Sequence, residues 1–229
     1  MGATTCPSGG IGIALLLSLT YPDVMDTNDC LSPETALGRL PPGARREQII
    51  AAASSLFAER GYHGASMQDV GERVGMLKGS LYAHVANKEE MLLEIVSTTS
   101  RRFIDALTPV LTGDDQVSVR IRLGLRTHLG VIHTDPDAAR VFMHEGRHLE
   151  GRPRLWIEEA HNRYERIWRQ AFEDGVRLAE FRHDLDTTAA TLLALSVGNW
   201  ITTRQGQVSD ITNDIADSFS SVLLAGCLV

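Results

Sequence analysis

Cysteine is scarce in this chain of 229 residues, which holds three. Cys6, Cys30 and Cys227 are odd in number and lie far apart in the sequence. Such spacing builds neither a disulfide framework nor a cysteine pair that would ligate zinc. The sequence therefore predicts a protein of a reducing compartment, and we expect the cytoplasm.

Long hydrophobic runs are also lacking. The apolar stretch at residues 11–19 is too short to cross a bilayer. Residues 1–38 contain no Lys or Arg, so the basic segment that opens a secretory signal is missing. We expect no membrane partner and interpret residues 1–43 as a flexible arm. An over-long start, with Met25 as the true initiator, is an alternative explanation of this segment.

An excess of positive charge, which many DNA-binding proteins have, is absent as well. The net charge is −7, with eight Lys or Arg against seven acids in residues 44–102 and thirteen against eighteen in residues 103–229. The acidic excess thus lies outside residues 44–102. A near-neutral segment can still bind DNA, but its non-specific affinity should be modest and strongly salt-dependent.

Helical periodicity dominates what the sequence does contain, and no convincing alternating strand or internal repeat occurs. Apolar residues recur at three- and four-residue spacing from Ala44 to Arg60, and Gly61 follows where a helix end favours glycine. Ser66 and Asp69 form a near match to the capping box that starts a helix. The pattern predicts an all-α protein with helices over 44–60, 67–74, 78–84, 88–111, 117–133, 136–150, 153–178, 186–205 and 210–224.

The second and third predicted helices have the form of a helix-turn-helix. Gly75, Met76 and Leu77 make the turn between two short helices. This unit typically places its second helix in the major groove of DNA, where the first turn meets the base edges. That turn would contain Lys78 and Gly79, and glycine there would permit close approach.

Residues 45–94 resemble the N-terminal domain of the TetR-type (TetR/AcrR) bacterial transcriptional regulators. The family pattern is a helix ending F-x-x-x-G-Y/F, a short helix ending A-G-V, then S-K-G-x-L-Y-x-H-F and K-E-x-L. This chain has FAERGY at 57–62, VGM at 74–76, KGSLYAHV at 78–85 and KEEM at 88–91. It departs from the pattern at two positions, with Leu77 in place of a capping Ser or Thr and Val85 in place of Phe.

The resemblance implies contacts of Tyr82 and His84 with the DNA backbone. Lys88, near the start of the fourth helix, is expected to share a phosphate with neighbouring N–H groups. Arg45 and Arg46 are expected to form a basic entry to the first helix. The complete set of predicted DNA-binding residues is Arg45, Arg46, Ser66, Gln68, Lys78, Gly79, Ser80, Tyr82, His84 and Lys88.

The family resemblance also implies a domain plan and a set of partners. A three-helix DNA-binding domain would occupy residues 44–92, and a helical ligand-binding and dimerisation domain residues 93–229, with about nine helices in all. We expect a homodimer formed through the last two helices, because a single helix-turn-helix seldom holds an operator alone. The expected partners are a double-stranded DNA operator and a small-molecule effector.

The ligand class is suggested by a second, looser resemblance. Residues 141–149 (VFMHEGRHL) resemble the F-x-H-E-W-R-x-L run of a subgroup that senses acyl-coenzyme A thioesters, with Gly146 in place of Trp. Such a ligand needs cations for its phosphates, a platform for adenine and an apolar tunnel. The candidate ligand residues are Arg120, Arg126, Arg147, Trp168, Asn199 and Trp200. The wider supply of arginine and tryptophan includes Arg122, Arg152, Arg154, Arg163 and Trp156.

The same run supports a rival hypothesis of a different class. His144-Glu145-Gly146-Arg147-His148 matches H-E-x-x-H, which on a helix places two imidazoles on one face to bind zinc, with the Glu as general base. Glu165 or Glu173 would supply a third ligand. A helical interaction protein that binds no DNA is the other alternative. We favour the transcriptional regulator, a repressor without enzymatic activity, cofactor or metal.

Overall fold

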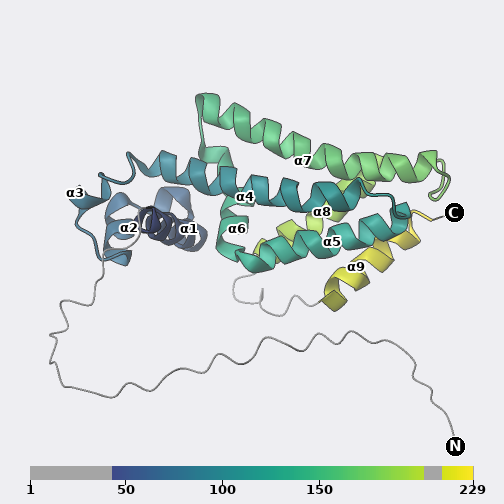
Figure 1. The fold of residues 1–229 in the computed structure, drawn as a ribbon, viewed down its shortest axis with the longest axis horizontal. Helices are drawn as coiled ribbons and strands as arrows, with labels where there is room; N and C mark the ends of the chain where they lie inside the picture. Colours follow the sequence, from purple (N-terminus) through teal and green to yellow (C-terminus); the bar gives the residue numbers. More distant parts are fainter. Residues whose placement is uncertain (1–42, 204–212, 229) are drawn as a thin grey trace, which may run out of the picture. The chain divides into compact units, whose positions relative to one another are not determined.

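The computed structural model describes residues 43–203 and 213–228. Within them, one isolated bridge between Phe181 and Leu228 is the sole β-type pairing, so the all-α prediction is confirmed. Most of the predicted arm and the predicted helix ends at Gln205 and Asp210 lie outside the described residues. The helices are α1 (Ala44–Gly64), α2 (Met67–Arg73), α3 (Lys78–Leu81), α4 (Lys88–Leu111), α5 (Val117–Thr134), α6 (Pro136–His144), the 3₁₀ turn η1 (Gly146–His148), α7 (Gly151–Arg177), α8 (Thr187–Thr203) and α9 (Asn213–Ala225) (Figure 1).

The signals that start and stop the first two helices work as predicted. Gly61 leaves the helical conformation with φ 74° and ψ 162°, so regular α1 ends where the sequence places its end. Ser66 caps α2, since its hydroxyl accepts the N–H of Asp69 while the Asp69 carboxylate accepts the N–H of Ser66. The predicted capping box is therefore confirmed.

Two helices are shorter than predicted. Helix α3 ends at Leu81 rather than at His84, and Leu77 before it provides no side-chain cap. Helix α6 ends at His144 rather than at Glu150, and a 3₁₀ turn follows. Gly146 contributes to this break, because glycine costs about 1 kcal/mol relative to alanine within a helix.

Helix α4 connects a small group of helices, α1 to α3, with a larger group, α5 to α9 (Figure 1). Its first half packs against α1, and it also contacts α5, α6 and α7. The predicted boundary between residues 92 and 93 therefore falls inside one continuous helix, although separate groups lie at its two ends. The limits of the two predicted domains stay a prediction.

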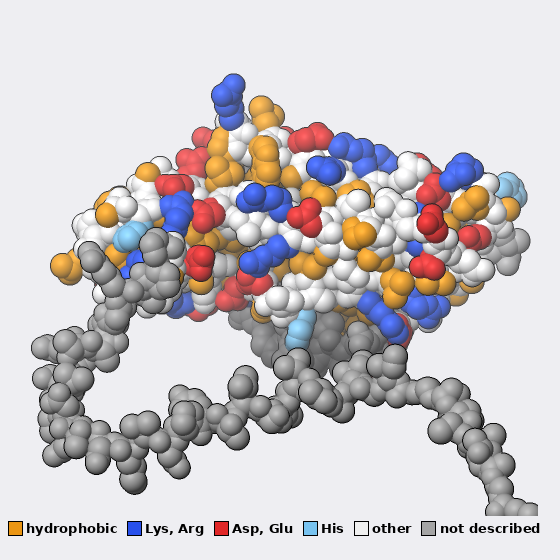
Figure 2. All heavy atoms as spheres, in the orientation of Figure 1, with side chains coloured by type: hydrophobic (Ala, Val, Ile, Leu, Met, Phe, Trp, Pro, Cys, Tyr) orange, Lys and Arg blue, Asp and Glu red, His pale blue; other side chains and the backbone are white. Residues whose placement is uncertain are grey.

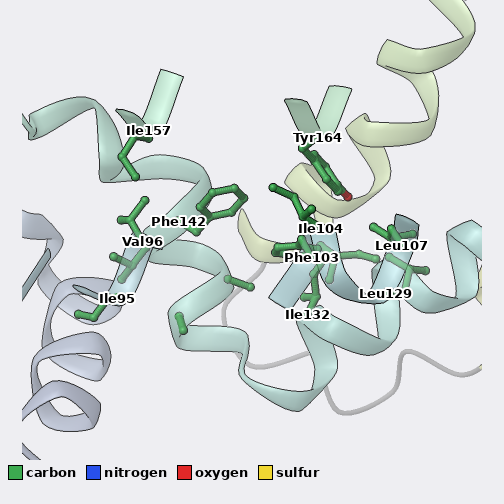
Figure 3. Packing of buried hydrophobic residues seen from close by; sticks show 14 of the residues in the cluster. Ile95, Val96, Phe103, Ile104, Leu107, Leu129, Ile132, Phe142, Ile157 and Tyr164 are labelled. Atoms are coloured by element: carbon green, nitrogen blue, oxygen red, sulfur yellow. The ribbon is translucent and has the colours of Figure 1, made fainter. Parts of the chain in front are cut away.

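The core of the larger group is built on aromatic side chains from α4, α6 and α7. Phe103 stacks with Phe142 at a centroid distance of 5.5 Å and lies at the same distance from Tyr164 (Figure 3). Trp168 is fully buried, and the Tyr164 hydroxyl bonds to Nδ1 of His128 at 2.5 Å. Burial lowers the pKa of His128 to about 4, so this imidazole is neutral at pH 7.

Two glycines provide a test of this packing. A Cβ on Gly175 would lie 2.2 Å from the buried ring of Phe181, whereas a Cβ on Gly130, inside α5, would meet nothing within 4 Å. We expect Gly175→Ala to lower the free energy of unfolding by about 1–3 kcal/mol, because the ring must move. Gly130→Ala, the matched control, should raise it by up to about 1 kcal/mol. Urea unfolding midpoints measure both, and a Gly175→Ala protein as stable as wild type would contradict this packing.

Candidate nucleic-acid interface and ligand domain

Helix α3 is held by two buried side chains and presents the rest to solvent. Leu81 and Val85 are 0% and 2% exposed. The predicted DNA-facing residues of this segment, namely Lys78, Gly79, Ser80, Tyr82 and His84, are all exposed. Figure 1 shows α3 at the outer edge of the group that α1 and α2 complete. The structure thus brings five predicted residues together on one short, accessible segment.

The first turn of α3 leaves room for a partner. Lys78 starts the helix, and a Cβ on Gly79 would meet no atom within 4 Å. Tyr82, directly after the helix, keeps 47% of its surface exposed although it is a large aromatic residue. A short helix with an exposed ammonium, hydroxyl and phenol at its start and end can supply both base-edge and phosphate contacts.

The predicted residues of α2 stand at its start. Ser66 is exposed but its side chain is engaged in the cap, where its hydrogen bonds to Asp69 lower the pKa of that carboxyl. Gln68 is exposed, and its Nε2 donates to Glu72 at 2.9 Å. Ser66 therefore stabilises the start of α2, while Gln68 remains on an accessible surface.

Arg45 and Arg46, the two arginines predicted to form a basic entry to the first helix, make different contacts. Arg46 donates from Nη2 to Glu90 at 2.7 Å and to Glu94 at 2.5 Å, and from Nη1 to the carbonyl oxygen of His84. Hydrogen bonds to these two carboxylates raise its pKa. Arg45 donates to Gln48 at 3.0 Å. Arg46 therefore ties α1 to α4 and to the end of the α3 segment, while the DNA contact predicted for Arg45 and Arg46 stays a prediction.

Lys88 also turns back into the protein. Its Nζ donates to the carbonyl oxygens of Tyr62 and Ala65 at 2.7 and 2.9 Å and lies 4.3 Å from the centre of the Tyr62 ring. Burial lowers the pKa of this amine. These contacts satisfy carbonyl groups after the end of regular α1, and the phosphate contact predicted for Lys88 stays a prediction.

Other cations of this region are paired within the protein. Nη1 of Arg60 lies 3.2 Å from Oδ1 of Asp69, and Nη1 of Arg73 lies 2.8 Å from Oε1 of Glu59. The Arg73 guanidinium lowers the pKa of Glu59 to about 2. Little positive charge remains free to neutralise phosphates, which agrees with the modest non-specific affinity expected from the sequence.

The H-E-x-x-H residues do not share one helix face. His144 ends α6, and its Nε2 lies 3.1 Å from Oγ1 of Thr202, whereas His148 sits in η1 with Nδ1 3.0 Å from Nε2 of His63. Among the described residues, no group of three or more His, Cys, Asp or Glu side chains could hold a metal ion. The helical geometry on which the zinc hypothesis depended is therefore wrong.

The six candidate ligand residues are dispersed in the structure. Arg120 is buried and donates to the carbonyl oxygen of Leu111 and to Asp174, while Arg126 pairs with Asp217 at 2.5 Å. These two arginines therefore form ion pairs within the protein, and the ligand contacts predicted for them stay predictions. Trp168 is buried in the core, and Arg147, Asn199 and Trp200 are exposed.

A groove between α4 and the start of α7 was not predicted as a unit. It has a volume of about 480 Å³. Its lining residues are Leu93, Ser97, Arg101, Arg152, Pro153 and Trp156. Arg152 and Trp156 belong to the wider set named from the sequence, but Arg101 was missed. The available signal was spacing, because Ser97 and Arg101 on α4 share a face, as do Arg152 and Trp156 on α7.

Comparison with known proteins agrees with this architecture. Residues 49–95 match the family model "Bacterial regulatory proteins, tetR family", and residues 114–227 match "Tetracyclin repressor-like, C-terminal domain". The chain belongs to the TetR family.

The chain matches nearly the whole length of several known proteins. The HTH-type transcriptional repressor KstR2 of Rhodococcus jostii (strain RHA1) is 28% identical over 204 residues, which cover 86% of this chain and 97% of that protein. The crystal structure of the TetR family regulator PfmR from Thermus thermophilus aligns with a TM-score of 0.71 and 27% identity, covering 79% and 96%. AibR in complex with isovaleryl coenzyme A and operator DNA aligns with a TM-score of 0.70 and 24% identity, covering 78% and 97%.

Membership of the TetR family confirms the fold and the broad function predicted from the sequence. The chain is a DNA-binding transcriptional regulator of a non-enzymatic family. The alternative hypothesis of a zinc hydrolase is therefore wrong. Among the described residues, no helix is long and apolar enough to cross a membrane. The individual DNA contacts of α2 and α3 remain predictions.

Tyr82 gives the sharpest test of the α3 surface. Because its ring is half exposed, Tyr82→Ala should weaken operator binding roughly tenfold, equivalent to about 1.4 kcal/mol, with little change in stability. Fluorescence anisotropy with the protein's own upstream DNA measures the affinity, and thermal unfolding checks the fold. Tyr82→Phe separates the hydroxyl from the ring. Wild-type affinity in both variants would show that Tyr82 does not face DNA.

Proposed function

We propose that this TetR-family protein is a homodimeric repressor that leaves a palindromic operator when it binds an acyl-coenzyme A thioester. The observation that carries the proposal is the outward-facing α3 segment, with Lys78, Ser80 and Tyr82 exposed over a buried Leu81. One such segment per protomer matches one half-site, and a dimer matches a palindrome.

Dimerisation is supported by the apolar surface of the last two helices. Leu192 and Leu193 on α8 are 56% and 61% exposed, and Val222 on α9 is 77% exposed. Trp200 and Phe219 on the same helices are 50% and 37% exposed. A second copy that covers this surface would remove it from water, which is the reason that large apolar patches mark protein interfaces.

The ligand class is supported by the groove between α4 and α7. Arg101 and Arg152 offer two guanidinium groups, which suit phosphate, and Trp156 offers an aromatic surface that is 45% exposed. Leu93 and Pro153 complete an apolar lining. Figure 2 shows hydrophobic and basic side chains together over this end of α7. Coenzyme A carries phosphates and an adenine, which match this combination of groups.

The similar proteins point the same way. KstR2 is named a transcriptional repressor, and AibR was solved with isovaleryl coenzyme A and operator DNA. In the proposed mechanism the ligand binds more tightly to an arrangement in which the two α3 segments no longer match successive major grooves, about 34 Å apart. The difference in affinity between the two arrangements sets the coupling, typically about 1–3 kcal/mol.

The dimer surface is tested by a charge placed on α9. Val222→Glu should convert the dimer to a monomer, because burial of an unpaired carboxylate in an apolar interface is strongly unfavourable. Light scattering coupled to size-exclusion chromatography measures the mass. Leu178→Glu, at a leucine that is 53% exposed after α7, is the matched control and should leave the dimer intact. A dimeric Val222→Glu protein would exclude this part of α9 from the interface.

The ligand groove is tested by removal of its two positive charges. Isovaleryl-coenzyme A should raise the melting temperature of the wild type, since a ligand that binds the folded state stabilises it. Arg101→Gln and Arg152→Gln should each weaken binding roughly tenfold, while Arg154→Gln, whose arginine pairs with Glu158 at 2.8 Å, should not. Coenzyme A alone and the free fatty acid show which half of the ligand is recognised. Equal binding by all four proteins would exclude the groove.

A further inference from the structure

Five side chains gather where α1 ends, although they come from three separate segments. Tyr62 and His63 follow the break in α1, Lys88 begins α4, and Glu145 and His148 lie between α6 and α7. We call these five residues the junction cluster. It contains two of the three motif residues that suggested zinc, and Lys88 is its one member among the predicted DNA-binding residues.

Glu145 makes the central contact of the junction cluster. Its Oε2 accepts the backbone N–H of Tyr62 at 2.8 Å, and its side chain is 15% exposed. Tyr62 follows Gly61, where regular α1 has ended. A hydrogen bond from an amide to a shielded carboxylate is stronger than one between neutral groups. Glycine suits position 61 because its φ of 74° lies in the left-handed region, which other residues rarely adopt.

His148 adds a second set of contacts to the same segment. Its Nδ1 lies 3.0 Å from Nε2 of His63, and its ring stacks on Tyr62 with a centroid distance of 5.8 Å and an interplanar angle of 15°. Lys88 approaches Tyr62 from α4 and binds its carbonyl oxygen. The chain after α1 is therefore held by α4 and by the segment after α6.

The segment around α6 also reaches α8. Arg140 donates from Nη1 to the carbonyl oxygen of Ala58 in α1 at 3.5 Å and from Nη2 to that of Thr203 in α8 at 3.2 Å. His144 contacts Thr202 of α8. A continuous path of polar contacts thus runs from α8 through α6 and the junction cluster to the end of α1, on which α2 and α3 are mounted.

We propose that Glu145 and His148 are positioning residues for operator binding, which fix the α1–α3 group relative to α8. The proposal rests on the dimer of the proposed function, in which α8 of each protomer lies at the shared interface. In that dimer a fixed angle between α8 and α1 sets the separation of the two α3 segments. Preorganised spacing favours a full operator over a single half-site, because no freedom of orientation is lost on binding.

Three variants test the role of Glu145. Glu145→Gln keeps an oxygen that accepts the Tyr62 N–H, Glu145→Met removes the acceptor at similar length, and Glu150→Met makes the same substitution at an exposed glutamate nearby. Affinity is measured for a full operator and for an isolated half-site. The preference for the full operator should fall roughly tenfold in Glu145→Met, about 1.4 kcal/mol. It should persist in Glu145→Gln and Glu150→Met, with half-site affinity unchanged in all three.

The half-site measurement separates positioning from damage. If Glu145→Met lost equal affinity for the half-site and for the full operator, α3 itself would be disturbed. If the preference for the full operator were unchanged or increased, Glu145 would not position α3. Either result overturns the proposal. Failure of the proposed function would look different, because the wild type itself would then lack the full-operator preference or be monomeric.

His148→Phe provides an independent test and substitutes for Glu145→Met if that protein does not fold. Phenylalanine keeps the ring against Tyr62 but loses the bond of Nδ1 to His63 and the contact of Nε2 with Glu145 at 3.4 Å. The full-operator preference should fall in His148→Phe and in His63→Phe. The double variant should lose no more than His148→Phe alone, because both substitutions remove the contact between His63 and His148. The role of His148 would be overturned if the double variant lost more of the full-operator preference than either single variant. It would also be overturned if neither single variant lost any of that preference.

Discussion

The structure depends on the burial of Leu81 and Val85 beneath the α3 segment. A helix of four residues has no stability of its own, since isolated helices of such length do not persist in water. It exists because these two side chains are 0% and 2% exposed, within the core that α1 and α4 also build. The same burial leaves Lys78, Ser80 and Tyr82 as the surface that a groove of DNA would meet.

Several cations around this segment bind carboxylates or backbone carbonyl oxygens within the DNA-binding group. Arg46 binds two carboxylates of α4, Arg73 binds Glu59, and Lys88 binds backbone carbonyl oxygens. Long-range attraction to phosphate is therefore weak for a protein of this function. In the proposed dimer, operator affinity then depends on the fit and spacing of two α3 segments, and the junction cluster and the proposed dimer surface would set that spacing.

The sequence predicted features that depend on neighbours in the chain and missed those that depend on distant ones. The break at Gly61 and the Ser66 cap are local, and both were found. The early end of α6 was missed, because Gly146 is buried against Val96 and Ile157 from other helices. Arg46 and Lys88 bind residues that are distant in sequence, and Arg101 and Arg152 line one groove although about fifty residues separate them. Such contacts could be found only in the folded structure.

Hydrogen–deuterium exchange of the protein with its operator tests whether the α3 segment enters DNA. If it does, amides of residues 66–85 should exchange more slowly in the presence of operator than in the presence of an unrelated duplex, while those of α8 and α9, the proposed dimer interface, remain as in the free protein. Operator binding that leaves residues 66–85 unprotected, or that protects only another surface, would contradict the account.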